Sequence, residues 1–166
     1  PHLTEVVTIE IEPAMVDAAR LFRPANARVY DDPRSTIVID DAKAYFAATS
    51  AQFDIILSEP SNPWVSGVSA LFTDEFYQRV RQYLAPNGVF GQWLHLYEID
   101  DGLVGSVLAA VHRNFPSYEV FFTSSVDLLI VASTSERSPV ADWSVAQYDG
   151  IQRDTRPFRA ITPATL

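Results

Sequence analysis

Apolar residues recur along the chain with two different spacings, one typical of strands and one typical of helices. Alternation of apolar and polar residues predicts a strand, and apolar residues three or four positions apart predict a helix. Residues 27–34 read as a short strand and turn, and residues 118–133 as two antiparallel strands around a polar turn. The remaining predicted strands are 6–11, 36–40, 53–58 and 89–97, and the predicted helices are 13–22, 42–49, 73–84 and 100–115.

The helix starts carry local signals that support these assignments. Pro13 suits a first helical turn, and Asp41 and Thr73 are suited to accept hydrogen bonds from the free N–H groups at a helix start. Asp74 and Glu75 place negative charge near the positive end of the third helix. The strand at 53–58 alternates like a buried strand, with Phe53, Ile55 and Leu57 on one side and Ile56 on the other.

Strands that alternate with helices predict an α/β fold. We expect a Rossmann-like, mostly parallel sheet with helices on both faces and a C-terminal antiparallel pair of strands, forming one domain over residues 1–133. Residues 134–166 are predicted as an irregular tail. Ligands of such sheets bind beyond the carboxyl ends of the strands. The residues expected at that edge are Glu10, Asp40, Asp41, 58–64 and 92–97.

The overall charge and composition exclude several functions. The net charge of −9 disfavours nucleic acid as a partner, because phosphate backbones are repelled. There is no cysteine, and His2, His95 and His112 lack the spacing of metal ligands, so we predict no metal site. No apolar run approaches the roughly 20 residues that span a membrane, and no signal peptide opens the chain. We expect no membrane contact by this chain itself and a cytoplasmic location.

Four segments, taken in order and spacing, resemble the spermidine synthase family. They are "VTIEIEP", "DDPRSTIVIDDAKAYF", "FDIILSEPSNPW" and "LFTDEFYQRVRQYLAPNGVFGQW". The resemblance covers roughly residues 6–132 and is closest to a bacterial branch in which such a domain is fused to membrane-spanning segments. It implies the class I S-adenosylmethionine-dependent methyltransferase fold, and it makes the soluble domain of a membrane-anchored parent an alternative for the location.

The resemblance also implies a nucleoside site. Glu10 matches the acid that holds both ribose hydroxyls, since a carboxylate accepts two hydroxyl donors well. Asp41 and Ala42 match the residues beside the adenine, and Ser58 is assigned to the same binding set. The implied cofactor, used as a substrate, is decarboxylated S-adenosylmethionine or S-adenosylmethionine, with no metal.

The loop after the strand at 53–58 departs from the family pattern. The family has Asp-Ser-Ser-Asp-Pro there, and this chain has Glu59-Pro60-Ser61-Asn62-Pro63. Glu59 and Asn62 are the catalytic candidates, although an amide such as Asn62 cannot accept a proton at neutral pH. Glu59, Trp64 and Gln92 are the expected residues of a pocket for a small amine or polyamine. The implied reaction is aminopropyl transfer to that amine.

Other readings stay open. "SNPW" resembles the Asn-Pro-Pro-aromatic loop of amino methyltransferases, which favours a methyltransferase acting on a small amine. The Asn62 departure favours a non-catalytic nucleoside- or polyamine-binding domain or a structural domain. The family's first strand and Gly-rich loop would lie before Pro1, so we expect a fragment whose sheet lacks that strand. A homo-oligomer is compatible with these patterns.

Overall fold

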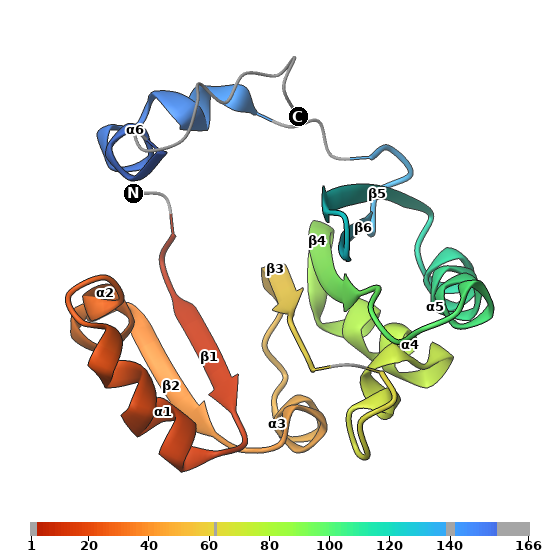
Figure 1. The fold of residues 1–166 in the computed structure, drawn as a ribbon, viewed down its shortest axis with the longest axis horizontal. Coiled ribbons are helices and arrows are strands. Elements are labelled where there is room, and N and C mark those ends of the chain that lie inside the picture. Colours follow the sequence, from red (N-terminus) through yellow and green to blue (C-terminus); the bar gives the residue numbers. More distant parts are fainter. Residues whose placement is uncertain (1–2, 62, 139–141, 156–166) are drawn as a thin grey trace. The chain divides into compact units, whose positions relative to one another are not determined.

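The computed structural model describes residues 3–61, 63–138 and 142–155, which form two compact units (Figure 1). The first unit is made of residues 1–52 and the second of residues 53–166. Each unit has its own hydrogen-bonded sheet, because the described strands form one two-stranded and one four-stranded sheet. The strand at 6–10 and the strand at 53–58 therefore belong to different sheets.

The first unit is built on two parallel strands, β1 (Val6–Glu10) and β2 (Ser35–Ile39), paired with Thr8 opposite Ile37. Between them run α1 (Pro13–Ala19), the short 3₁₀ helix η1 (Arg20–Phe22) and α2 (Ala27–Asp31). Helix α3 (Ala42–Ala48) follows β2. The predicted helix starts at Pro13 and Asp41 are confirmed.

The prediction of a strand at 27–34 is wrong, because residues 27–31 form helix α2. The apolar positions Ala27 and Val29 alternate with polar ones, but Ala and Arg favour a helix, and five residues are too few for periodicity to decide. The tertiary contact that holds the helical turn comes from Tyr30, whose hydroxyl donates to the carbonyl of Val16 in α1 at 2.8 Å.

The second unit contains the four-stranded sheet in the order β3-β4-β6-β5. Strands β3 (Phe53–Ser58) and β4 (Leu84–His95) are parallel, whereas β6 (Asp127–Ser133) runs antiparallel to both β4 and β5 (Ser117–Ser124). The α/β class and the closing antiparallel pair are thus confirmed.

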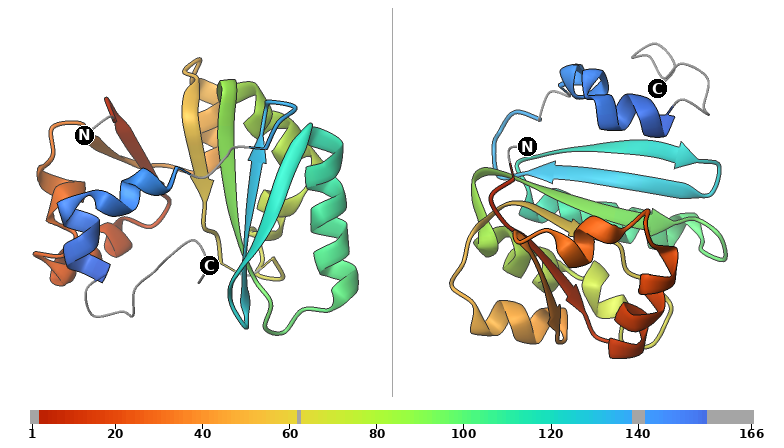
Figure 2. Two further views of the ribbon diagram at one scale, coloured as in Figure 1. Left: turned by 90° about the horizontal axis from the view of Figure 1, so that it is seen from above. Right: turned by 90° about the vertical axis from the view of Figure 1, so that its left-hand side faces the viewer.

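One face of this sheet is covered by α4 (Asp74–Tyr83) and α5 (Asp101–Asn114), which Figure 2 shows on the same side of the strands. The 3₁₀ helix η2 (Ser69–Phe72) leads into α4. Both long helices carry the predicted apolar stripe, and Thr73 accepts a hydrogen bond from the N–H of Phe76 at 3.3 Å. The core of the unit consists of Phe72, Phe76, Tyr77, Val80, Leu84, Phe90, Leu94, Val107, Ala110, Val111, Phe115, Leu128, Ile130 and Ala132.

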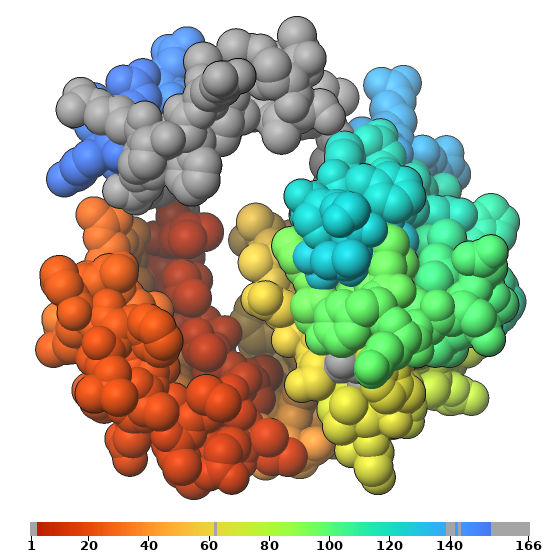
Figure 3. All heavy atoms as spheres, in the orientation of Figure 1, coloured from red at the N-terminus to blue at the C-terminus, as the bar shows by residue number. Residues whose placement is uncertain are grey.

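The expectation that β3 is a buried strand is wrong for one of its two sides. Ile55 is 54% exposed and Leu57 is 77% exposed, whereas Ile56 packs against the core. The reason is that α4 and α5 cover the Ile56 side of the strand. In Figure 3 the yellow atoms of β3 lie at the surface beside the green atoms of β4.

The segment predicted as an irregular tail contains two short helical elements in its described part, η3 (Trp143–Gln147) and α6 (Asp149–Thr155). The predicted boundary between a domain at 1–133 and a tail at 134–166 stays a prediction. Within the described ranges, none of the helices has the length and apolar character needed to cross a membrane.

Candidate functional site

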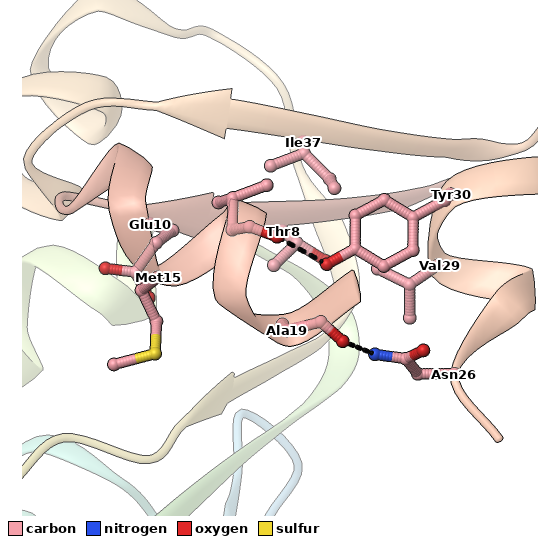
Figure 4. A pocket seen from close by; sticks show the side chains of 9 residues that line it. Thr8, Glu10, Met15, Ala19, Asn26, Val29, Tyr30 and Ile37 are labelled. Atoms are coloured by element: carbon pink, nitrogen blue, oxygen red, sulfur yellow. Dashed lines mark hydrogen bonds between the residues drawn. The ribbon is translucent and has the colours of Figure 1, made fainter. Parts of the chain in front are cut away.

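Glu10 is the last residue of β1, where the strand turns toward α1. Its carboxylate accepts a hydrogen bond from the N–H of Glu12 at 2.9 Å, which holds the side chain at the strand end. Glu10 also lines a cavity of about 200 Å³ within the first unit (Figure 4). The other lining residues are Thr8, Met15, Val16, Ala19, Asn26, Val29, Tyr30 and Ile37.

The side chain of Asn26 in this cavity has a buried amide oxygen that accepts no hydrogen bond from a described residue. Its Nδ2 donates to the carbonyl of Ala19 at 2.6 Å, but no described residue donates to its buried Oδ1 (Figure 4). The guanidinium of Arg20 lies 4.3 Å from the centre of the Tyr30 ring and covers it. The cavity therefore has one carboxylate, Glu10, and one free amide oxygen among mostly apolar walls.

Asp41 caps α3. Its Oδ1 accepts from the N–H groups of Lys43 and Ala44 at 2.9 and 3.1 Å, so the capping role uses one oxygen only. No described residue donates to the exposed Oδ2. The N–H of Asp40 donates to the carbonyl of Glu10 at 3.2 Å, so the structure places Glu10 and the start of α3, with Ala42 as its first residue, at the same end of the β1–β2 pair.

In the second unit, Ser58 and Gln92 face each other across the parallel strands β3 and β4. The Gln92 side chain is completely buried, and its Nε2 lies 3.4 Å from both the carbonyl and the hydroxyl oxygen of Ser58 and 3.2 Å from the carbonyl of Trp93. Two carbonyl oxygens can only accept, which fixes the amide nitrogen on that side. The Oε1 atom of Gln92 is therefore buried without a donor among the described residues.

The loop after β3 places Glu59 in an exposed position directly beyond the strand end. Trp64 is 38% exposed and meets the ring of Tyr97 edge-on, with 5.9 Å between ring centres. Tyr97 follows β4, so this contact joins the loop to the end of the neighbouring strand. Asn62 lies outside the described residues, and its predicted role stays a prediction.

A pair that the sequence did not reveal lies at the end of β4. The Nδ1 of His95 is 2.7 Å from Oδ1 of Asp127, the residue opposite it on β6. The hydroxyl of Ser124 donates to the other carboxylate oxygen of Asp127 at 2.7 Å. Hydrogen bonds from Ser124 and then from His95 lower the pKa of Asp127. The only sequence signal was the alternation of Trp93, His95 and Tyr97 along one strand.

The structure thus gathers the predicted residues in two sets. Glu10, Asp41 and Ala42 lie at one end of the first unit's strand pair, and Ser58, Glu59, Trp64 and Gln92 lie at the carboxyl end of β3 and β4 in the second unit. Among the described residues, no group of three or more His, Asp or Glu side chains is arranged to hold a metal ion.

Solved structures with the same fold define the class of the chain. A spermidine synthase in complex with the transition-state analogue AdoDATO aligns with a TM-score of 0.71 and 25% identity, over 81% of this chain and 48% of the other. Human methyltransferase-like protein 13 in complex with SAH aligns with a TM-score of 0.67 and 22% identity, over 98% and 76% of the two chains. The fold is that of the class I methyltransferases.

The family follows from the sequence. Residues 1–138 match the family model of the spermine/spermidine synthase domain, and the chain belongs to this family. The polyamine aminopropyltransferase of Klebsiella pneumoniae is 40% identical over 86 residues, which are 51% of this chain and 30% of that protein. The enzyme of the same name from Erwinia tasmaniensis is 39% identical over 90 residues, 54% and 31% of the two chains. The matched part is under a third of these relatives.

Proposed function

We propose that this chain acts in the transfer of an aminopropyl group from decarboxylated S-adenosylmethionine to a small amine or polyamine. Its membership of the spermine/spermidine synthase domain family supports the reaction type. The single observation that carries the proposal is the Gln92 amide, which is completely buried at the end of β4 while its Oε1 has no donor among the described residues.

A buried acceptor without a donor costs about 1–3 kcal/mol. An amine that binds beside Gln92 supplies the missing N–H group and removes that cost. Glu59, exposed directly beyond β3, supplies a negative charge for a second ammonium group of a polyamine. The net charge of −9 favours the approach of such cations over that of anions.

The donor molecule has an adenosine part, which the first unit is suited to hold. Glu10 accepts hydrogen bonds from the two ribose hydroxyls, and the free Oδ2 of Asp41, beside Ala42, accepts from the adenine amino group. The role of Ser58, in the second unit, in donor binding stays a prediction. Both carboxylates keep a local backbone hydrogen bond, so their positions are fixed before the ligand binds.

The bond-making step is an in-line displacement at the carbon next to the sulfonium sulfur. The charge of the sulfonium already activates that carbon, so the protein supplies mainly orientation and a dry environment for the amine nitrogen. Asn62 is proposed to orient the amine through its amide oxygen, and Trp64 to cover the amine with its ring.

Calorimetric titration of the chain with methylthioadenosine, S-adenosylmethionine and decarboxylated S-adenosylmethionine tests the donor side. We expect micromolar binding of methylthioadenosine that is lost in Glu10→Ala. Glu5→Ala is the matched control, because Glu5 is an exposed carboxylate directly before β1 in the same unit. Equal loss in both variants, or no binding of the three compounds to the wild type, would contradict the donor assignment.

Mass spectrometry of the product tests the amine side. With decarboxylated S-adenosylmethionine and putrescine we expect an aminopropylated product, and Gln92→Met should lower kcat/KM by at least tenfold because the amide acceptor is lost. Gln78→Met, at an exposed position of α4, should leave the rate unchanged. A methylated amine formed from S-adenosylmethionine would instead support the methyltransferase reading, and binding without any product would support a non-catalytic binding domain.

A further inference from the structure

We infer that His95 is the base that takes the proton from the attacking amine, with Asp127 as the residue that orients it. The inference rests on the proposed amine-transfer function. It starts from a gap in that proposal: the loop after β3 offers the exposed carboxylate of Glu59 and the amide of Asn62, and an amide does not accept a proton at neutral pH.

The geometry of the pair is that of an oriented base. Nδ1 of His95 lies 2.7 Å from Oδ1 of Asp127, and Ser124 donates to the second carboxylate oxygen at 2.7 Å. An ionised carboxylate only accepts hydrogen bonds, so the contact assigns the imidazole proton to Nδ1 and leaves the lone pair on Nε2. No described residue donates to Nε2. A base held by a third group in this way is the arrangement that activates nucleophiles in many enzymes.

The backbone around the pair keeps it in place. His95 and Asp127 are directly opposite in the antiparallel ladder of β4 and β6, and the N–H of Leu96 donates to the carbonyl of Val126 at 2.7 Å. The side chains are 27% and 19% exposed, so the imidazole is shielded but still reaches solvent. Water can therefore remove the proton after each reaction.

His95 also lies at the edge where the amine is proposed to bind. Its ring centre is 5.2 Å from that of Tyr97, and Tyr97 in turn contacts Trp64 of the loop. Gln92 precedes His95 by three residues on β4, and the two side chains approach the strand end from opposite faces of the sheet. His95 is thus placed to meet an amine on the face of the strand end that carries Tyr97 and Trp64.

The amine arrives as R–NH₃⁺ and gives one proton to Nε2 of His95, which becomes an imidazolium paired with the Asp127 carboxylate. The free nitrogen lone pair forms the new N–C bond, and the C–S bond breaks with its electron pair going to sulfur. The products are a neutral thioether and a secondary ammonium ion, and the imidazolium releases its proton to water.

The pH dependence follows from the groups around the imidazole. Asp127 on β6 and Tyr97 after β4 are the titratable side chains in contact with it, and Trp93 is the uncharged neighbour, with ring centres 6.4 Å apart. The base works only when the imidazole is neutral. We therefore expect kcat/KM to be lower in acid, where the imidazole is protonated and cannot accept the proton of the amine.

The test compares the wild type with His95→Gln, Asp127→Asn and the control His112→Gln, an exposed histidine on α5 of the same unit. With decarboxylated S-adenosylmethionine and putrescine, loss of the base should lower kcat by about 10²–10⁴-fold and remove the acidic limb of the pH profile. Asp127→Asn should lower kcat less than His95→Gln does. In a further variant, His95→Ala, which leaves space for a free base, added imidazole should restore part of the rate. His112→Gln should match the wild type. Full activity of His95→Gln would overturn the inference.

A second measurement decides the inference if the wild-type chain makes no product, a result that would count against the proposed function. The ring-nitrogen resonances of the histidines are recorded at one fixed pH with and without putrescine. An amine that donates to Nε2 changes the surroundings of that atom, so we expect putrescine to shift the Nε2 resonance of His95 and leave the resonances of His112 unchanged. A histidine that does not respond to putrescine would overturn the base assignment.

Discussion

The buried phenol of Tyr77 predicts a core substitution that raises the free energy of unfolding. Tyr77 in α4 is completely buried between the rings of Phe76 and Phe90, with ring centres 5.8 and 5.9 Å away, and its hydroxyl has no hydrogen-bond partner among the described residues. A buried hydroxyl without a partner costs about 1–3 kcal/mol. Removal of one oxygen loses little packing. Tyr77→Phe should therefore raise the free energy of unfolding by about 1 kcal/mol, where most core substitutions lower it.

Urea unfolding followed by tryptophan fluorescence reports on the second unit, to which Tyr77 belongs, because all three tryptophans lie within residues 53–166. With a urea dependence of about 2 kcal/mol per molar, the midpoint should move up by about 0.5 M. Tyr118→Phe is the matched control. Tyr118 on β5 is only partly buried, so its hydroxyl reaches water and its removal should change the midpoint little.

The pH dependence of the stability is a second test of the same reasoning. Burial raises the pKa of the Tyr77 phenol, so the wild type should lose stability as the pH rises above about 10, where the unfolded phenol ionises. Tyr77→Phe should lack that part of the loss. If Tyr77→Phe lowers the midpoint instead, the hydroxyl has a partner in solution, such as a buried water, and the reasoning from an unpaired hydroxyl is wrong.

Three further predictions follow from single contacts. Hydrogen bonds from Ser124 and His95 lower the pKa of Asp127 in the folded protein. The stabilisation that they give is present above the unfolded pKa of about 3.9 and is lost as the pH falls through the folded pKa. Asp127→Asn should therefore weaken the fall of the melting temperature with decreasing pH in a thermal unfolding series. Asp41→Ala should cost about 0.5–2 kcal/mol by urea unfolding, whereas Asp41→Asn should keep the cap; equal costs would contradict the capping role. In the same urea assay Leu57→Ser should change the free energy of unfolding by less than about 0.5 kcal/mol, because the side chain is 77% exposed, whereas Ile56→Ser should lower it by more than about 1 kcal/mol, because Ile56 packs against the core.

The elements of the fold were predictable where periodicity extends over many residues. Helices α4 and α5 show this best, since their buried stripes and the Thr73 cap were both visible in the sequence. The five residues of α2 were too short for that signal, and the contact between Tyr30 and Val16 decides their conformation. For β3, alternation identified the strand but not its buried face, because the positions of the covering helices are tertiary information.

The residues of the candidate site were also predictable only in part. Ser58 and Gln92 were identified from their positions at strand ends, and the parallel register of β3 and β4 does bring them together. The partnership of His95 with Asp127 was not predictable. It joins residues 32 positions apart, and it depends on the register of two antiparallel strands, which no spacing in the sequence fixes.

The residues proposed for the nucleoside and those proposed for the amine can be tested separately, because they lie in different units. Glu10 and Asp41 belong to the first unit and are assigned to the nucleoside, whereas Gln92, His95 and Asp127 belong to the second and are assigned to the amine and its proton. A change at Glu10 or Asp41 should therefore alter the affinity for the nucleoside and leave that for the amine intact. If Glu10→Ala weakened putrescine binding as much as methylthioadenosine binding, the loss would reflect unfolding, and the assignment of Glu10 to the ribose would lose its support.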